Sequence, residues 1–301
     1  MSTRLLVAGS TGLLGGEICR FLADAGKPFR ALVRTTSDME KVERLKQLGA
    51  ELIHADLKDR ASLDVACQKC TAVISTVSTT ISRQEGDTIE TVDRDGQLSL
   101  VDAARNAGVQ QFVFISFPPI DPEVPLEQAK RAVESHLQKS GMKYTILQPV
   151  NFMEVWLSPA IGFDYPKRKV QVYGSGDNKV SWISFRDVAK FAVASIGNPS
   201  VYDSIIPLGG PDALSYNDAI KMFEDATGET FTVESIPAEA LEAQKNSATD
   251  SLQKSFAGMM HALAVKEFTI EMEDTLKKLP VQMVSVMDYI SEVAGVSAAD
   301  A

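Results

Sequence analysis

A glycine-rich loop near the start of the chain constrains its fold more than any other feature. Gly9, Gly12 and Gly15 follow a short apolar run at residues 5–8, and an amphipathic helix pattern begins directly behind them. In such a strand–loop–helix unit, the first glycine permits a tight turn and the second lets backbone N–H groups approach a pyrophosphate, while the third lets the helix lie close to the sheet. A tight turn without a ligand is the alternative. The loop predicts a dinucleotide site comprising Gly9, Ser10, Thr11, Gly12, Leu13, Leu14 and Gly15.

The first half of the chain continues as an alternation of short apolar runs and amphipathic segments. Strands are expected at residues 29–33, 51–55, 72–75, 112–116 and 144–147, with helical segments between most of them. Strands separated by helices of about 10–15 residues form parallel sheets with right-handed crossovers. The chain is therefore expected to be an α/β protein with a doubly wound, parallel Rossmann sheet.

The pattern changes after residue 150, which indicates a second domain. Residues 1–150 are predicted to form the Rossmann domain, and residues 180–208, with a helix at 185–196, are predicted to return to it. Residues 151–179 and 209–301 are expected to form a smaller, mostly helical lobe on the substrate side. In this lobe we expect a polar loop at 165–169, a turn at 174–178, a helix at 216–227 and helical segments around 238–265 and 271–294.

The end of the second strand carries an arginine, which bears on the choice of cofactor. An acidic residue there would accept hydrogen bonds from the ribose hydroxyls and favour NAD. Arg34 instead offers a planar fork for the 2′-phosphate of NADP. Ser10, Thr11 and Thr35 would add hydroxyl donors, and Lys41 a second charge. A solvated arginine at a strand end is the alternative, but the loop and Arg34 together predict NADPH.

Residues after the next two strands complete the predicted cofactor site. Asp56 and Leu57 follow the third strand, where an adenine ring would lie. An aspartate that simply leads into the next helix is an equally open reading of Asp56. Thr76 and Val77, which follow the fourth strand, are assigned to the same site.

Composition excludes several other classes of protein. The 301 residues carry a formal net charge of -10 without a long basic run, which argues against binding to nucleic acid. Cys19, Cys67 and Cys70 are too few for a disulfide framework, and Cys67 and Cys70 lack a second pair at metal-binding spacing. No apolar stretch approaches the ~20 residues that cross a bilayer. We therefore expect a soluble, cytoplasmic protein that binds no membrane and no metal, of undetermined oligomeric state.

Several segments resemble the NmrA-like, or isoflavone-reductase-like, atypical short-chain dehydrogenases/reductases. The resemblance covers residues 4–210 most clearly and is carried by Gly9 to Gly15, Ala31-Leu32-Val33-Arg34, Gly49-Ala50-Glu51, Asp56-Leu57, Lys130, residues 140–149, Asn151-Phe152-Met153-Glu154, Trp182-Ile183-Ser184 and Asp187-Val188-Ala189. It implies an NADPH-binding Rossmann domain with a small C-terminal substrate domain. The family includes reductases of aromatic natural products, quinone reductases, and redox-sensing regulators that bind NADP(H) without known turnover.

The chain departs from ordinary short-chain dehydrogenases at the position of their catalytic tyrosine. Those enzymes carry Tyr-x-x-x-Lys on the helix after the fifth strand, but here Leu126 stands four residues before Lys130. Tyr165 and Lys169 match the spacing literally, but they fall in the expected Pro-containing loop and are set aside.

Lys130 is consequently the candidate catalytic acid and also a candidate cofactor ligand, a role that the resemblance implies for a lysine on this helix. A lysine in a partly buried cleft can have a lowered pKa and donate a proton. A plain surface lysine is the alternative. Ser116, at the end of the fifth strand, is the second catalytic candidate because it could bond a substrate oxygen, although a structural serine is equally plausible.

The segment after the sixth strand is predicted to face the nicotinamide and the substrate. Pro149, Asn151 and Phe152 are assigned to the cofactor, and Phe117, Met153 and Trp156 to an apolar substrate wall to which Phe152 also contributes. Packing between the lobes is the alternative for these apolar residues.

Three functions are compatible with these features. The favoured one is an NADPH-dependent reductase acting on a carbonyl, enone or quinone-like, aromatic small molecule. The second is a non-catalytic NADP(H) sensor, which the missing tyrosine supports. The third, an NADP-dependent epimerase or dehydratase, is disfavoured because the usual acid–base pair is absent.

Overall fold

The structure is a computed structural model that describes residues 4–121 and 123–295. It divides into two compact units, each of which is described by itself. The first comprises Met1–Phe117, Pro125–Gln148 and Val188–Ile206, and the second comprises Pro118–Val124, Pro149–Asp187 and Pro207–Ala301. The predicted Rossmann domain also included residues 118–124, 149–150, 180–187 and 207–208, which this division assigns to the second unit.

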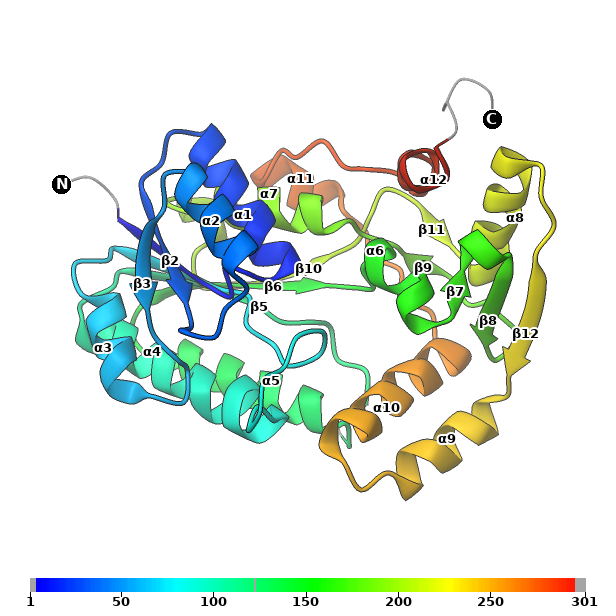
Figure 1. The fold of residues 1–301 in the computed structure, drawn as a ribbon, viewed down its shortest axis with the longest axis horizontal. Coiled ribbons are helices and arrows are strands. Elements are labelled where there is room, and N and C mark those ends of the chain that lie inside the picture. Colours follow the sequence, from blue (N-terminus) through cyan, green and yellow to red (C-terminus); the bar gives the residue numbers. More distant parts are fainter. Residues whose placement is uncertain (1–3, 122, 296–301) are drawn as a thin grey trace. The chain divides into compact units, whose positions relative to one another are not determined.

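A seven-stranded sheet organises the first unit (Figure 1). Its strands are β1 (Leu5–Ala8), β2 (Phe29–Val33), β3 (Glu51–His54), β4 (Ala72–Ser75), β5 (Gln111–Ile115), β6 (Lys143–Pro149) and β10 (Ser204–Leu208), in the spatial order β10-β6-β5-β4-β1-β2-β3. Strand β1 pairs in parallel with both β2 and β4, and the pairs β2–β3, β4–β5 and β5–β6 are also parallel. The order reverses direction between β1 and β4, and ligands of doubly wound sheets bind beside the strand ends at such a switch point.

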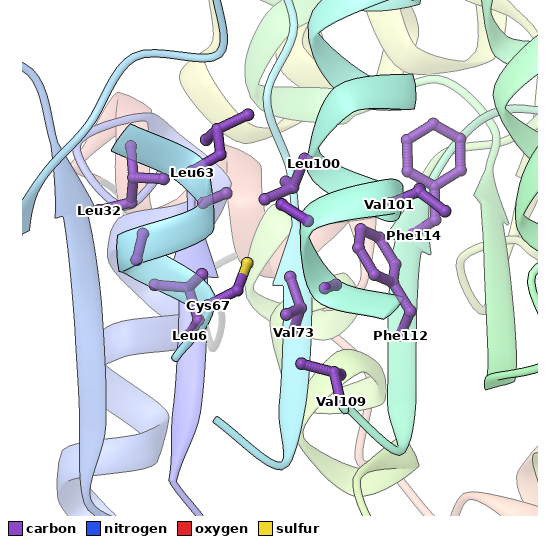
Figure 2. Packing of buried hydrophobic residues seen from close by; sticks show 14 of the residues in the cluster. Leu6, Leu32, Leu63, Cys67, Val73, Leu100, Val101, Val109, Phe112 and Phe114 are labelled. Carbon is purple, nitrogen blue, oxygen red and sulfur yellow. The ribbon is translucent and has the colours of Figure 1, made fainter. Parts of the chain in front are cut away.

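Helices cover both faces of this sheet, as the sequence predicted (Figure 1). One face carries α1 (Leu13–Asp24), α2 (Met39–Gln47) and α7 (Phe185–Ser195), and the other carries α3 (Arg60–Cys67), α4 (Gln97–Asn106) and α5 (Pro125–Gln138). Apolar side chains from the strands, among them Leu6, Val73 and Phe112, pack against Leu63 of α3 and Leu100 of α4 (Figure 2). Burying each such side chain contributes about 1.5–3 kcal/mol, so this layer fixes the strand ends where a ligand would bind.

A π-helix, η1 (Ile89–Gly96), runs directly into α4. Thr88 caps it, because its hydroxyl accepts a hydrogen bond from Thr91 N and the Thr91 hydroxyl accepts one from Thr88 N. The sequence predicted the α-helix from its apolar spacing but not the wider turns before it. Helices of this kind are rare and often occur at functional sites.

The second unit is mostly helical, as expected, with α6 (Met153–Trp156), α8 (Tyr216–Thr227), α9 (Ala238–Ser247), α10 (Ser251–Val265), α11 (Glu273–Lys278) and α12 (Val286–Ala294). The helical segment expected around 238–265 consists of α9 and α10, and Asp250 starts α10 by accepting hydrogen bonds from Leu252 N and Gln253 N. The segment expected around 271–294 likewise consists of two helices, α11 and α12.

Small sheets in the second unit were not predicted. Strands β7 (Phe163–Asp164), β8 (Lys169–Tyr173) and β12 (Thr232–Ile236) form one, in which β8 pairs in parallel with β12 and antiparallel with β7. The polar loop expected at 165–169 is therefore a 3-10 turn, Tyr165–Lys167, followed by the start of β8. Strands β9 (Val180–Ser181) and β11 (Ala213–Leu214) form a second, antiparallel pair.

Candidate functional site

The glycine loop has the close backbone approaches that a pyrophosphate cradle requires. Gly9 has a φ of +85°, which favours glycine, and its carbonyl accepts a hydrogen bond of 2.9 Å from Gly12 N. A Cβ on Gly15 would lie 2.0 Å from Gly9 O, so a side chain there would force α1 away from the loop. These features fit the predicted dinucleotide, because only glycines leave the N-terminus of α1 this close to the turn.

A groove of about 700 Å³, which includes space open to solvent, lies over this loop in the first unit. It brings together eight of the predicted cofactor residues, namely Gly9, Thr11, Gly12, Arg34, Asp56, Leu57, Thr76 and Val77. Its other lining residues were not predicted: Leu32, Ser37, Ser78, Thr79, Ser82, Asp87 and Val92. Ser10, Leu13, Leu14, Gly15, Thr35 and Lys130 do not belong to the lining. The hydroxyl of Ser10, expected to face the cofactor, instead donates a 2.7 Å hydrogen bond to Leu32 O and is buried.

Arg34 is not a freely solvated side chain. Its Nη1 lies 2.6 Å from Asp87 Oδ2, and Lys58 Nζ lies 2.6 Å from the other oxygen of the same carboxylate. Burial alone would raise the pKa of Asp87, but hydrogen bonds from Lys58, Arg34 and Gln84 N together lower it. Lys41, the second charge expected from the sequence, is exposed on α2. A cation that no sequence motif marked, Lys58, shares the carboxylate of Asp87 with Arg34, and a contact of Lys41 with a cofactor stays a prediction.

The segment after β3 is tightly hydrogen-bonded. Asp56 Oδ1 accepts a 2.8 Å hydrogen bond from Lys58 N, and Asp56 N donates to the hydroxyl of Ser62. Asp59, rather than Asp56, caps helix α3, since its side chain accepts a hydrogen bond from Ala61 N. Asp56 lines the groove and also bonds the segment that leads into α3, so its contact with a cofactor stays a prediction.

Lys130 is buried, which excludes the surface-lysine alternative. It is 5% exposed, its Nζ donates a 3.2 Å hydrogen bond to Ile115 O, and it lies 4.9 Å from the ring centroid of Phe114. Burial lowers the pKa of this amine, and the nearby charges of Asp93 and Glu134 partly oppose the effect. The structure therefore holds a lysine of lowered pKa at the end of β5.

Ser116 lies at the same strand end and takes part in a polar network with the next residue of α5. Arg131 Nη2 donates a 3.2 Å hydrogen bond to the Ser116 hydroxyl and a second, shorter one to Phe117 O. Arg131 also pairs with Glu134 at 3.0 Å. The two predicted catalytic residues therefore both lie at the carboxyl end of β5, where Lys130 bonds Ile115 O and Ser116 bonds Arg131.

The residues predicted after β6 belong to the second unit. Phe152 lies 5.0 Å from Phe185 between ring centroids, and Trp156 meets the edge of Tyr173 at 6.2 Å. Met153 and Trp156 are buried, and Asn151 O accepts a hydrogen bond from Ile183 N. Pro149 also belongs to this unit, whereas Phe117 belongs to the first. Contacts of these six residues with a cofactor or substrate stay predictions.

Two sequence patterns were set aside, the Tyr165–Lys169 match and the cysteine pair, and their side chains pack or pair within the protein. Tyr165 stacks on Phe223 with centroids 5.5 Å apart, and Lys169 pairs with Glu234 across the small sheet at 3.7 Å. Cys19, Cys67 and Cys70 are all free and buried, and burial raises the pKa of Cys19 and of Cys67 to about 12. Within residues 4–121 and 123–295, no helix is both long and apolar enough to cross a membrane.

Known proteins with a similar sequence include enzymes and assembly factors. A Photosystem II assembly factor Ycf39 from Guillardia theta is 29% identical over 303 residues, which cover 97% of this chain and 94% of that protein. An NAD(P)H azoreductase from Xenophilus azovorans is 30% identical over 282 residues, covering 91% of this chain and 92% of the relative.

Solved structures share the fold. An NADPH-dependent quinone oxidoreductase from Escherichia coli, complexed with NADPH, superposes with a TM-score of 0.78 at 20% identity, covering 96% of this chain and 99% of that one. The family profile described as NmrA-like matches residues 1–295, which is nearly the whole chain. With the glycine cradle and the order of the sheet, this match shows that the chain belongs to the NmrA-like family.

Proposed function

We propose that the protein is an NADPH-dependent reductase that transfers hydride to a carbonyl, enone or quinone-like small molecule. The observation that carries this proposal is the burial of Lys130 at the carboxyl end of β5, in the unit that contains the glycine cradle. Burying an ammonium group costs free energy, so a buried lysine occurs at a functional site more often than as a residue that only fills the core. The azoreductase relative and the fold shared with a quinone oxidoreductase support the same reaction class.

The chain's own residues would bind the cofactor and manage the proton. Backbone N–H groups of the glycine loop would bind the pyrophosphate, and Arg34 would bind the 2′-phosphate. NADPH, when bound, supplies the hydride. Lys130 Nζ would hold the proton that the reduced acceptor takes up, and its lowered pKa makes the ammonium a better acid at neutral pH. Ser116, oriented by Arg131, would bond the acceptor oxygen.

A second function, an NADP(H)-binding sensor without turnover, is favoured by two specific observations. The Ycf39 relative is named as an assembly factor rather than as an enzyme. In addition, the Lys130 ammonium already donates a hydrogen bond to Ile115 O, as a structural lysine would.

A cytoplasmic location is likewise a proposal, supported by three free, buried thiols.

NADPH oxidation by the wild type, Lys130→Ala and Lys139→Ala distinguishes the two functions. Lys139 is exposed just beyond α5 and serves as the matched control. The acceptors would be quinones, enones, azo dyes and aromatic aldehydes, with the NADPH Kd measured in parallel by fluorescence. A reductase loses turnover only in Lys130→Ala while NADPH still binds. Tight NADPH binding by the wild type without turnover of any acceptor would instead establish the sensor.

A further inference from the structure

We propose that Lys58 and Arg34 together form a two-cation site for the 2′-phosphate of NADPH, and that Asp87 is the residue that positions both cations. The inference rests on the proposed function in one respect, that the groove binds NADPH. It adds two residues that determine the choice between NADPH and NADH.

The three side chains converge from segments far apart in the sequence. Arg34 follows β2, Lys58 follows β3, and Asp87 comes from the segment between β4 and η1. Each oxygen of Asp87 accepts a hydrogen bond of 2.6 Å from one cation, Oδ1 from Lys58 Nζ and Oδ2 from Arg34 Nη1. The carboxylate therefore sets the distance between the two cations.

A short turn fixes the Asp87 carboxylate in place. Asp87 N donates a 3.0 Å hydrogen bond to Gln84 O, and Gln84 N donates a 2.9 Å hydrogen bond back to Asp87 Oδ2. Gly86 has a φ of +77°, as the turn requires. The Gln84 side chain also bonds both the carbonyl and the hydroxyl of Thr36, which ties the turn to the segment after β2.

Exposure shows which groups remain available to a ligand. The side chain of Asp87 is only 2% exposed, whereas those of Arg34 and Lys58 are 25% and 32% exposed. The carboxylate thus lies behind the two cations. A guanidinium has five N–H donors and an ammonium three, and each cation spends only one of them on Asp87. The remaining donors can bind phosphate oxygens while Asp87 stays in place.

The charges are arranged to recognise a dianion. Asp87 is the carboxylate that pairs with both cations, and it can neutralise only one of them; Asp56 also lines the groove, but its Oδ1 accepts from the backbone N–H of Lys58. A phosphate group carries close to two negative charges and forms strong hydrogen bonds with such donors. NADH has an uncharged hydroxyl in place of this phosphate, so loss of Lys58 should weaken the binding of NADPH far more than that of NADH.

The test compares the Kd of NADPH with that of NADH by isothermal titration calorimetry. In Lys58→Met, NADPH affinity is expected to fall on the order of 10- to 100-fold, while NADH affinity changes less than about twofold. Lys46→Met, which removes an exposed lysine of α2 that has no assigned role in the site, should change neither. Equal loss of affinity for both cofactors, or unchanged NADPH affinity in Lys58→Met, would overturn the assignment. A wild type that binds neither cofactor would instead defeat the proposed function.

Asp87→Asn tests the positioning role separately. Asparagine cannot hold both cations with charged hydrogen bonds, so NADPH affinity should fall with NADH affinity retained, which also shows that the variant is folded. An increase in NADPH affinity would mean that the carboxylate competes with the phosphate, and it would overturn the positioning role.

Discussion

The carboxylate of Asp93 accepts two hydrogen bonds from Thr79, one from the backbone N–H at 3.0 Å and one from the hydroxyl at 2.6 Å. Thr79 lines the groove, and Asp93 lies in the π-helix η1. Both residues are buried, and both bonds go to Oδ2. Asp93 therefore fastens the groove wall that follows β4 to the helix that continues into α4.

Replacing Asp93 with alanine should destabilise the protein. Thr79 would keep a buried N–H and a buried hydroxyl without their acceptor, and an unsatisfied buried group costs about 1–3 kcal/mol. Urea unfolding should show a loss of free energy of unfolding of about that size, and the NADPH Kd should rise because the groove wall is released. Asp95→Ala, which removes an exposed aspartate of the same helix, is the matched control. Similar losses in both variants would show that the Thr79 bonds contribute little.

Two adjacent glycines of α1 should respond to alanine in opposite directions. A Cβ on Gly15 would lie 2.0 Å from Gly9 O, whereas one on Gly16 would have its nearest neighbour, Ser10 O, at 3.8 Å. Gly15→Ala should lose at least about 2 kcal/mol of stability, because the helix must move away from the loop. Gly16→Ala should gain about 0.5–1 kcal/mol, because alanine favours helix. Thermal unfolding of the two variants measures both effects, and equal shifts would argue against the close helix–loop packing.

The buried amine of Lys130 should make stability depend on alkaline pH. Burial lowers the pKa of Lys130 in the folded protein below the value of 10.5 expected for the unfolded chain. Between these two pKa values the unfolded chain holds a proton that the folded protein has released, so the free energy of unfolding rises with pH. The free energy of unfolding of the wild type should therefore rise relative to that of Lys130→Met as the pH increases toward 10.5.

Urea unfolding at a series of pH values measures this difference. The exposed Lys139 provides the control, since Lys139→Met should differ from the wild type by a constant amount. A difference for Lys130→Met that does not change with pH would show that the amine titrates normally despite its burial.

Much of the cofactor groove could be predicted because its signals are local. The turn from Gly9 to Gly15 is written in consecutive residues, and Arg34 lies at the end of an apolar run that folds as β2. Parallel strands bring their carboxyl ends to one edge of a sheet, so Asp56 and Thr76 could be assigned to the same groove from strand order alone.

The missed residues depend on contacts that no local pattern encodes. Lys58 and Asp87 are an ordinary lysine and an ordinary aspartate in sequence, and they become a pair only when two loops meet beside Arg34. Strand β12 was missed because most of its residues are exposed, so its apolar pattern is weak. The sequence left open whether Lys130 is buried or at the surface, because it is followed directly by a second cation, Arg131, and the structure decides for burial.

The number of residues in the π-helix η1 determines where the Asp93 side chain points. Ile89–Gly96 winds with wider turns than the α-helix it joins, and it carries Asp93 to Thr79. Deleting one residue would let α-helical winding extend backward from α4, and each residue removed rotates the preceding ones by roughly 100° about the axis. The Asp93 carboxylate would then point away from the groove wall. The length of this segment is therefore constrained. Insertions and deletions among related proteins should occur in the preceding loop rather than within the eight residues of η1.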